Sequence, residues 1–312
     1  MRLKRFFAAG FLVAGLLLSP AALYGQAWTP PAGQGTVWVS TQMLHADAHL
    51  LGSGITPDID VRATTFTLGL DYGLTDRLAF GLSLPYVSTR FDGGVPHAGS
   101  VVDSGADHRT PTDLRLDLRY KALDSIVAFT PMASVLMPTN DYDTLGHSAP
   151  GRGLREYAAG FDVGYNAVPI SPSLFLSGGY RFTYVERIDD EITVDRSNAE
   201  VHADYLVTER LALRASGIWQ ETDGGLDLPL APSQRREHGQ HHDQLARANF
   251  WHGSVGAGYG LTPSLDLFVS WSTSLEGVNS HRFRSWSGGV SWRFDRSRLR
   301  RIRQPAASPI TP

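Results

Sequence analysis

The sequence predicts an all-β fold, an antiparallel transmembrane β-barrel of about 12 strands, on three observations. Segments in which apolar and polar residues alternate recur along the chain, as in strands that face lipid on one side and water on the other. The connections between these segments are alternately short and long. An aromatic residue of the same side-chain parity closes every second segment: Tyr72, Tyr120, Tyr165, Tyr205, Tyr259 and Phe294. Such a row is typical of the aromatic girdle at one membrane interface.

The expected strands lie at 35–46, 60–72, 77–90, 112–122, 126–137, 156–166, 173–185, 198–207, 211–221, 249–259, 265–275 and 282–294. Connections such as 73–76 and 208–210 are short enough for periplasmic turns, whereas 91–111, 138–155 and 222–248 are long and polar, as expected of extracellular loops. The sequence of residues 72–78 is similar to those of 205–211 and 259–265, which indicates the same type of hairpin turn at three places. An even number of strands places both termini in the periplasm.

The N-terminus has the three parts of a secretory signal peptide. Arg2, Lys4 and Arg5 precede an apolar run at 6–18, and the small residues Gly25 and Ala27 favour cleavage after Ala27. The run is short for a spanning helix, which needs about 20 residues. We therefore expect a signal peptide at 1–27, a periplasmic N-terminal segment at 28–34, a barrel at 35–294 and a basic, disordered periplasmic tail at 295–312. This organisation predicts the outer membrane of a Gram-negative bacterium.

Composition excludes several other classes of protein. The chain has no cysteine, so disulfides and a cysteine-linked lipid anchor are excluded. The formal net charge is −3, and basic residues are interleaved with acidic ones except near the C-terminus. No nucleic-acid partner is therefore expected.

The parity of the aromatic residues also predicts which charged side chains face the inside of the barrel. An Arg or Lys on the lipid face costs about 2–4 kcal/mol near the bilayer midplane, so the charges should face inward. The candidate lumen-lining residues are Asp113, Arg115, Asp117, Arg119, Lys121, Asp162, Arg181, Glu200, His202, Asp204 and Arg214. A hairpin centred on Glu209 places Asp204 opposite Arg214, which predicts an ion pair between them.

Two interpretations of this polar interior stay open. The charges either fill the barrel as mutually satisfied pairs or line a conduit for small solutes. Eight strands leave room only for side chains, and 16–18 leave an open channel, so about 12 strands favour a narrow or loop-gated lumen. Residues 226–231 are apolar enough to fold into the extracellular mouth, and 28–31 could enter the barrel as a plug instead of staying in the periplasm.

A metal site is not expected. The stretch 235–243 contains three histidines and an aspartate, which are good metal ligands, but they lie in a loop with no ligand spacing on a rigid element. Histidines in a flexible loop are more often a solvated surface. No metal or other cofactor is therefore expected.

Four segments together resemble the meta-pathway phenol-degradation family of outer-membrane proteins. They are 72–77, 82–86, 113–120 and 138–141, and their order and spacing are similar to that family over most of 60–294. Asn140 stands where the family has glycine. The resemblance implies a transporter barrel for aromatic or other hydrophobic small molecules. The expected partners are outer-membrane lipid, a small-molecule solute and the barrel-assembly machinery.

Two other functions remain as alternatives to a channel. A structural or adhesive barrel would not transport, although the loops lack the length and repeats that adhesion favours. An outer-membrane hydrolase is suggested by His252-Gly253-Ser254, because outer-membrane phospholipases use a histidine and a serine two residues apart. Strand parity places Trp251 and Tyr259 toward lipid and therefore His252 and Ser254 inside, away from a lipid substrate. The protein is not expected to be an enzyme.

Overall fold

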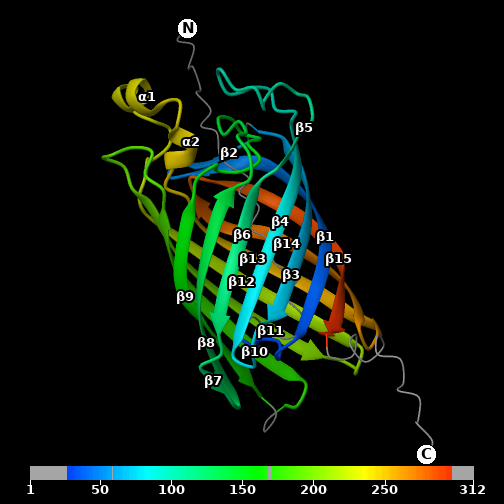
Figure 1. Cartoon of the computed structure of the whole chain (residues 1–312). Helices are drawn as coiled ribbons and strands as arrows, with labels where there is room; N and C mark the ends of the chain where they lie inside the picture. The colour runs from blue at the N-terminus through cyan, green and yellow to red at the C-terminus, as the bar shows by residue number, and fades with distance from the viewer. Residues whose placement is uncertain (1–26, 58, 168–170, 297–312) are drawn as a thin grey trace, which may run out of the picture.

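The computed structural model describes residues 27–57, 59–167 and 171–296. Its antiparallel strands form one closed barrel, capped at one end by loops and two short helices (Figure 1). The long strands are β1 (Gln34–Leu51), β3 (Val61–Gly73), β4 (Leu78–Phe91), β6 (Asp113–Tyr120), β8 (Val127–Pro138), β9 (Glu156–Asn166), β10 (Leu174–Val185), β11 (Val194–Leu206), β12 (Leu211–Gly224), β13 (Asn249–Thr262), β14 (Leu265–Val278) and β15 (Ser280–Asp295). The predicted barrel of about 12 antiparallel strands is confirmed.

The barrel closes between its first and last long strands. The register runs from Gln34 opposite Asp295 to Leu50 opposite Ser280. Three short strands lie at the edges of this cylinder: β2 (Gly54–Thr56) pairs with β1, β5 (His108–Pro111) with β4, and β7 (Leu123–Asp124) with β8. Closure leaves no strand edge unpaired around the barrel, which is the condition for a sheet to cross a hydrocarbon layer.

Side-chain alternation divides each strand between lipid and lumen. In β3, Ala63, Thr65 and Thr67 are buried inside, whereas Phe66 and Leu68 are 46% and 45% exposed on the outside. An outer surface of large apolar side chains around a polar interior is the arrangement of an outer-membrane barrel. Among the described residues, no helix is long and apolar enough to cross a membrane.

Two of the three copies of the repeated turn sequence fold in the same way. In the β3–β4 hairpin the Thr75 hydroxyl accepts hydrogen bonds from the backbone N–H groups of Arg77 and Leu78, at 3.2 and 2.9 Å. In the β11–β12 hairpin Thr208 does the same for the two residues at the matching positions. A short side chain that satisfies two backbone donors stabilises a tight turn. The repeat is therefore a local structural device.

Several strands extend farther at the capped end than the sequence predicted. β1 continues to Leu51, and β11 begins at Val194, where it pairs with Gly224 at the end of β12. These extensions rise above the apolar band, so neither face meets lipid and the alternation that marks a membrane strand is lost. For this reason the predicted boundaries at 46, 198 and 221 were too short.

The six aromatic residues of the predicted girdle lie near strand ends, and all but Phe294 of the last strand are followed by a turn. The rings of Tyr72 and Phe294 stack at a centroid distance of 6.1 Å and 12°. Gly35 of β1 lies between these two residues in the register and leaves room for the Phe294 ring. Tyr120, Tyr205 and Tyr259 are exposed on the outside. Their role at the lipid interface stays a prediction.

The first described residues enter the periplasmic end of the lumen. Trp28 packs edge-on against Phe175, at 6.3 Å between ring centroids, and covers the inward-facing Gly164. The Thr130 hydroxyl donates a 2.7 Å hydrogen bond to the carbonyl of Ala27, which is fully buried. Of the segment expected in the periplasm at 28–34, at least Trp28 thus lies inside the barrel. Residues 1–26 of the expected signal peptide and 297–312 of the expected tail lie outside the described residues.

The opposite, extracellular end carries a folded cap, which we define as residues 92–107, 139–155 and 225–248. It includes α1 (Pro232–His238) and α2 (His242–Leu245), drawn above the barrel in Figure 1. Its buried apolar residues Leu154, Leu226, Leu228, Leu230, Leu245 and Ala246 form one cluster with Val185 and Val194 at the ends of β10 and β11. The apolar stretch 226–231 therefore packs into the mouth, and the loop expected to be flexible is anchored by it.

Candidate functional site

The lumen contains a cavity of about 320 Å³ in its extracellular half. Arg152 and Asp243 of the cap line its upper end. Arg115, Arg181, Glu200 and His202 of the barrel are the deepest charged or titratable residues of its lining. A cavity of this size is at the small end of the range for small-molecule sites.

The cavity has two chemically different walls. All six charged strand residues of its lining lie on β6, β9, β10 and β11, which we call the charged wall: Asp113, Arg115, Glu156, Arg181, Arg196 and Glu200. The strands from β12 through β15 and β1 to β4, which we call the neutral wall, contribute Leu44, Val87, Ile218, Phe250 and Phe283 together with uncharged polar side chains. A molecule inside therefore meets an apolar, partly aromatic surface on one side and ionic groups on the other.

An ion-pair triad lies at the centre of the charged wall. The Arg181 guanidinium contacts the Glu200 carboxylate at 2.7 Å and the Asp162 carboxylate at 3.0 Å. His202 lies 3.6 Å from Glu200. Asp162, Arg181 and Glu200 lie on β9, β10 and β11, which are consecutive in the barrel. The strand register therefore aligns the triad. Two carboxylates around one guanidinium leave the wall polar but locally neutralised.

The upper part of the charged wall is tied to the cap. Arg196 of β11 pairs with Glu156 of β9 across the intervening β10, on the lumen side. The Tyr142 hydroxyl donates a 2.5 Å hydrogen bond to Asp113 and accepts one of 2.9 Å from the backbone of Gly153. Burial, reinforced by the Asp113 carboxylate, raises the pKa of Tyr142, so the hydroxyl remains a donor. Burial lowers the pKa of Arg152 to about 10, which leaves this guanidinium charged at neutral pH.

Further ion pairs lie in the periplasmic half of the lumen and at its rim. Arg214 lies directly opposite Asp204 in the β11–β12 register and contacts its carboxylate at 2.5 Å, so the predicted pair is confirmed. Lys121 pairs with Asp124 at 2.7 Å. Two further pairs were not predicted. Arg119 of β6 pairs with Asp71 of β3 across the intervening β4, and Arg293 of β15 pairs with Asp266 of the adjacent β14 at 3.1 Å.

The structure divides the eleven candidate lumen residues between these two regions. Asp113, Arg115, Arg181, Glu200 and His202 line the cavity. Asp117 pairs with Arg115 at 2.8 Å and Asp162 pairs with Arg181, so each aspartate holds the guanidinium of a cavity-lining arginine. Arg119, Lys121, Asp204 and Arg214 belong to the pairs of the periplasmic half. That a solute passes along these residues stays a prediction.

Sequence reasoning missed the neutral wall. Phe250 and Phe283 line the cavity, and His252 lies between them: its ring stacks on Phe250 at 4.0 Å and meets Phe283 edge-on at 4.7 Å. The signal was present, because Trp251 and Trp286 are exposed outside and fix the opposite parity for their strand neighbours. A search for inward charges does not find inward aromatic residues.

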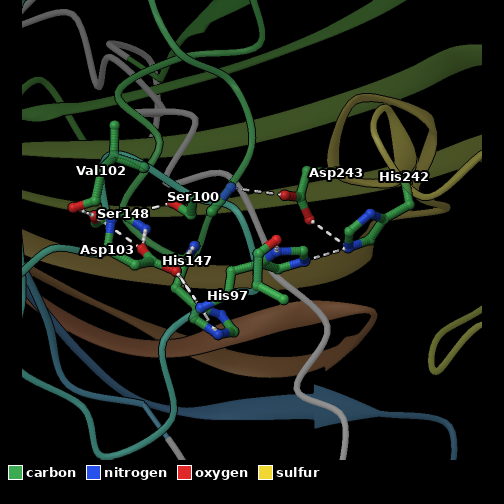
Figure 2. A network of polar contacts seen from close by, with 10 residues as sticks. His97, Ser100, Val102, Asp103, His147, Ser148, His242 and Asp243 are labelled. Atoms are coloured by element: carbon green, nitrogen blue, oxygen red, sulfur yellow. Dashed lines mark hydrogen bonds and ion pairs between the residues drawn. The ribbon is translucent and has the colours of Figure 1, made fainter.

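A polar network fixes the cap over the cavity (Figure 2). The buried Asp103 carboxylate accepts hydrogen bonds from the backbone N–H groups of His97, His147 and Ser148, at 2.9, 3.0 and 3.0 Å. In a second link, Arg152 donates to the carbonyl of Gln244 at 2.5 Å, and the Gln244 amide returns a bond of 2.7 Å to the carbonyl of Arg152. All three segments of the cap are thereby joined, since a buried carboxylate with several donors is a strong anchor.

Several solved structures have a fold similar to that of this chain. The chain is similar to the COG4313 outer-membrane channel from Pseudomonas putida F1 at a TM-score of 0.64 and 16% identity, covering 86% of this chain and 98% of that one. It is also similar to the NanC porin (TM-score 0.51, 10% identity, 82% and 98% covered) and to the translocator domain of the autotransporter NalP from Neisseria meningitidis (0.50, 13%, 85% and 90%). No curated protein matches the chain. At these identities the likeness supports the fold.

The family profile described as "Putative MetA-pathway of phenol degradation" matches residues 36–294, which is the barrel from β1 to β15. This match covers most of the chain and confirms the resemblance drawn from the residues of four short segments. The chain therefore belongs to this phenol-degradation family of barrel proteins.

Proposed function

We propose that this protein is an outer-membrane channel for small aromatic or otherwise hydrophobic solutes that carry a polar group. The observation that carries the proposal is the two-sided cavity. A flat apolar solute can lie against Phe250, Phe283 and Leu44 of the neutral wall while its polar group meets Arg181 or Arg115 of the charged wall. Aromatic rings gain from such ring contacts beyond simple burial, by about 0.5–1.5 kcal/mol for each pair.

The size and the family agree with a small solute. A cavity of about 320 Å³ accommodates a single-ring compound and is small for an extended oligomer. The family description refers to phenol degradation, and phenols combine one aromatic ring with one polar group. The solved barrels similar to this chain include a channel and a porin, which supports transport over catalysis.

The hydrolase alternative is weakened by the position of its two candidate residues. His252 is stacked between two phenylalanines of the lumen, and the Ser254 hydroxyl is 2.6 Å from that of Ser216, which also faces inward. A nucleophilic serine needs a base within hydrogen-bond reach and a third group that orients the base. The neutral wall around Ser254 supplies an apolar and hydroxylic surface for contact with a solute instead.

A purely structural barrel is the second alternative, and conductance separates the two. We expect the protein in a planar bilayer to give discrete current steps that phenol or benzoate reduces. The double variant Phe250→Ala and Phe283→Ala should raise the half-blocking concentration about tenfold, which corresponds to about 1.4 kcal/mol of lost contact. Phe161→Ala is the matched control, because this ring is exposed on the lipid side of β9.

Three results would count against the proposal. A folded barrel without current steps favours a structural role. Equal block of the wild type and the double variant places the aromatic solute somewhere other than this cavity. Lipase activity in detergent micelles that disappears in Ser254→Ala assigns the protein to the hydrolases.

A further inference from the structure

The cap contains a group of three potential metal ligands that come from two separate segments. His97 belongs to the segment between β4 and β5, and His242 and Asp243 begin α2. One ligand atom from each residue lies within 4.8 Å of the other two. His97 Nε2 is 2.9 Å from His242 Nε2, and His242 Nε2 is 3.2 Å from Asp243 Oδ1. Figure 2 shows the three side chains pointing toward one another.

The hydrogen bonds on the far side of the two imidazole rings determine which atoms face the centre. His242 Nδ1 is 2.8 Å from the carbonyl oxygen of Gly239, and His97 Nδ1 is 3.3 Å from that of Ala98. A carbonyl oxygen only accepts, so each Nδ1 must carry the hydrogen if these bonds form. In a neutral imidazole the other nitrogen then presents a lone pair. Both Nε2 atoms therefore offer lone pairs to the same small volume.

The aspartate completes the group. Asp243 is 3% exposed, and its Oδ2 accepts a 2.9 Å hydrogen bond from the backbone of Gly146. Its Oδ1, which faces the histidines, accepts no hydrogen bond within the part of the chain that the structure describes. A buried carboxylate oxygen without a hydrogen-bond donor is poorly solvated, which costs free energy. A cation at the centre would remove this penalty.

A single proton shared within the group does not satisfy all three ligand atoms. One proton bridges two of the three electron-rich atoms, whereas a metal ion engages all three. Metal–nitrogen bonds of about 2.0–2.1 Å place neighbouring ligand atoms roughly 3.0–3.4 Å apart, close to the separations of 2.9 and 3.2 Å found here. Metal-bound histidines also commonly donate their second N–H to a backbone carbonyl, as both rings do here.

We propose that His97, His242 and Asp243 bind one divalent transition-metal ion, with Zn²⁺ as the representative, at the extracellular mouth. Imidazole nitrogens with one carboxylate suit this class of ion. The ion joins the segment 92–107 to α2 and so fixes two parts of the cap to each other. The ligands all belong to the cap, and the site adjoins the upper end of the cavity, which Asp243 also lines. It assigns a role to a histidine-rich stretch that the sequence alone gave no reason to select.

Calorimetric titration of Zn²⁺ into the chelator-treated, dialysed protein in detergent tests the site. We expect one ion per chain, and at least about 100-fold weaker binding in His97→Ala and in Asp243→Asn, since each loses one of three ligands. His238→Ala is the matched control: it lies in the same segment but contacts Asp189, at 2.9 Å, and should bind Zn²⁺ like the wild type. Heat-dependent gel mobility shows that each variant forms the barrel.

A spectroscopic measurement guards against indirect effects of the variants. Co²⁺ bound to the wild-type protein should give an X-ray absorption spectrum with two imidazole ligands and at least one oxygen ligand. Zn²⁺ should also slow hydrogen exchange in both 92–107 and 239–246. The proposal is overturned if the wild type binds no stoichiometric Zn²⁺, if His97→Ala binds as tightly as His238→Ala, or if the bound Co²⁺ has no imidazole ligands.

Discussion

Inside this barrel, the partner of a charged residue depends on the strand register. Arg214 meets Asp204 because the β11–β12 hairpin is centred on Glu209, and a slip of one strand by one residue would turn one of the two side chains toward lipid. Asp204 is 2% exposed, so its carboxylate depends on the guanidinium for compensation. Removing one partner of a buried ion pair is costly, because the other charge stays behind without solvation.

Reversing Arg214 to Glu should therefore destabilise the barrel by about 3–5 kcal/mol, the usual cost of leaving a buried charge uncompensated. Urea unfolding in detergent, followed by the loss of heat-resistant gel mobility, measures the effect. Changing Asp204 to Arg in the same chain should recover most of the loss, since the pair is restored in the opposite sense. A single reversal as stable as the wild type would contradict the register.

Which residues face inward could be predicted, but not which of them meet. Alternation assigned Arg119 and Arg181 to the lumen, and for Arg181 the partners lie on adjacent strands. Arg119 instead reaches Asp71 on β3, which is separated from β6 by β4. The contacts of a long side chain across a curved lumen depend on barrel curvature and rotamers. Neither is encoded in the periodicity of a single strand.

The cap is the element that sequence reasoning described least well. Its three segments have no periodicity, because they pack as an irregular layer against the ends of the strands. Its histidines looked like a solvated loop, yet His242 is 5% exposed and lies against His97, 145 residues away along the chain. Only the apolar run 226–231 gave a usable signal, and it does pack into the mouth.

Asp103 is the residue on which the cohesion of this element depends. Its carboxylate joins two segments of the cap through backbone N–H groups of His97, His147 and Ser148. Asp103→Asn keeps the size of the side chain but removes the charge and one acceptor oxygen. Hydrogen bonds to a charged group are worth about 1.5–3 kcal/mol, so we expect the cap to loosen by an energy of that order.

Hydrogen–deuterium exchange measures this loosening directly: exchange should rise by about tenfold or more at 97–104 and 146–149, since about 1.4 kcal/mol corresponds to a factor of ten. The membrane strands should be unaffected. Asp141→Asn is the control, because Asp141 lies exposed in the same cap. Unchanged exchange at 146–149 would show that Asp103 does not hold the cap together.

Folded parts of the chain cover both ends of the lumen. The cap covers the extracellular end, and Trp28 covers the lumen surface of Gly164 at the periplasmic end. Paired charges such as Arg214 with Asp204 lie between that end and the cavity. An ion that crosses the barrel meets these regions one after the other. Their electrical resistances therefore add, and the conductance of the channel depends on their sum.

This serial arrangement predicts how two variants combine. Trp28→Ala should lower the resistance of the periplasmic end, and Asp103→Asn that of the extracellular end. Because conductance is the inverse of a sum of resistances, the gain of the double variant should exceed the sum of the two single gains. Single-channel recording in planar bilayers measures all three, with Trp286→Ala as the control, since its ring is 57% exposed on the lipid face. A double variant that conducts no better than one of the singles would mean that one end alone limits the current, and the other does not obstruct the path.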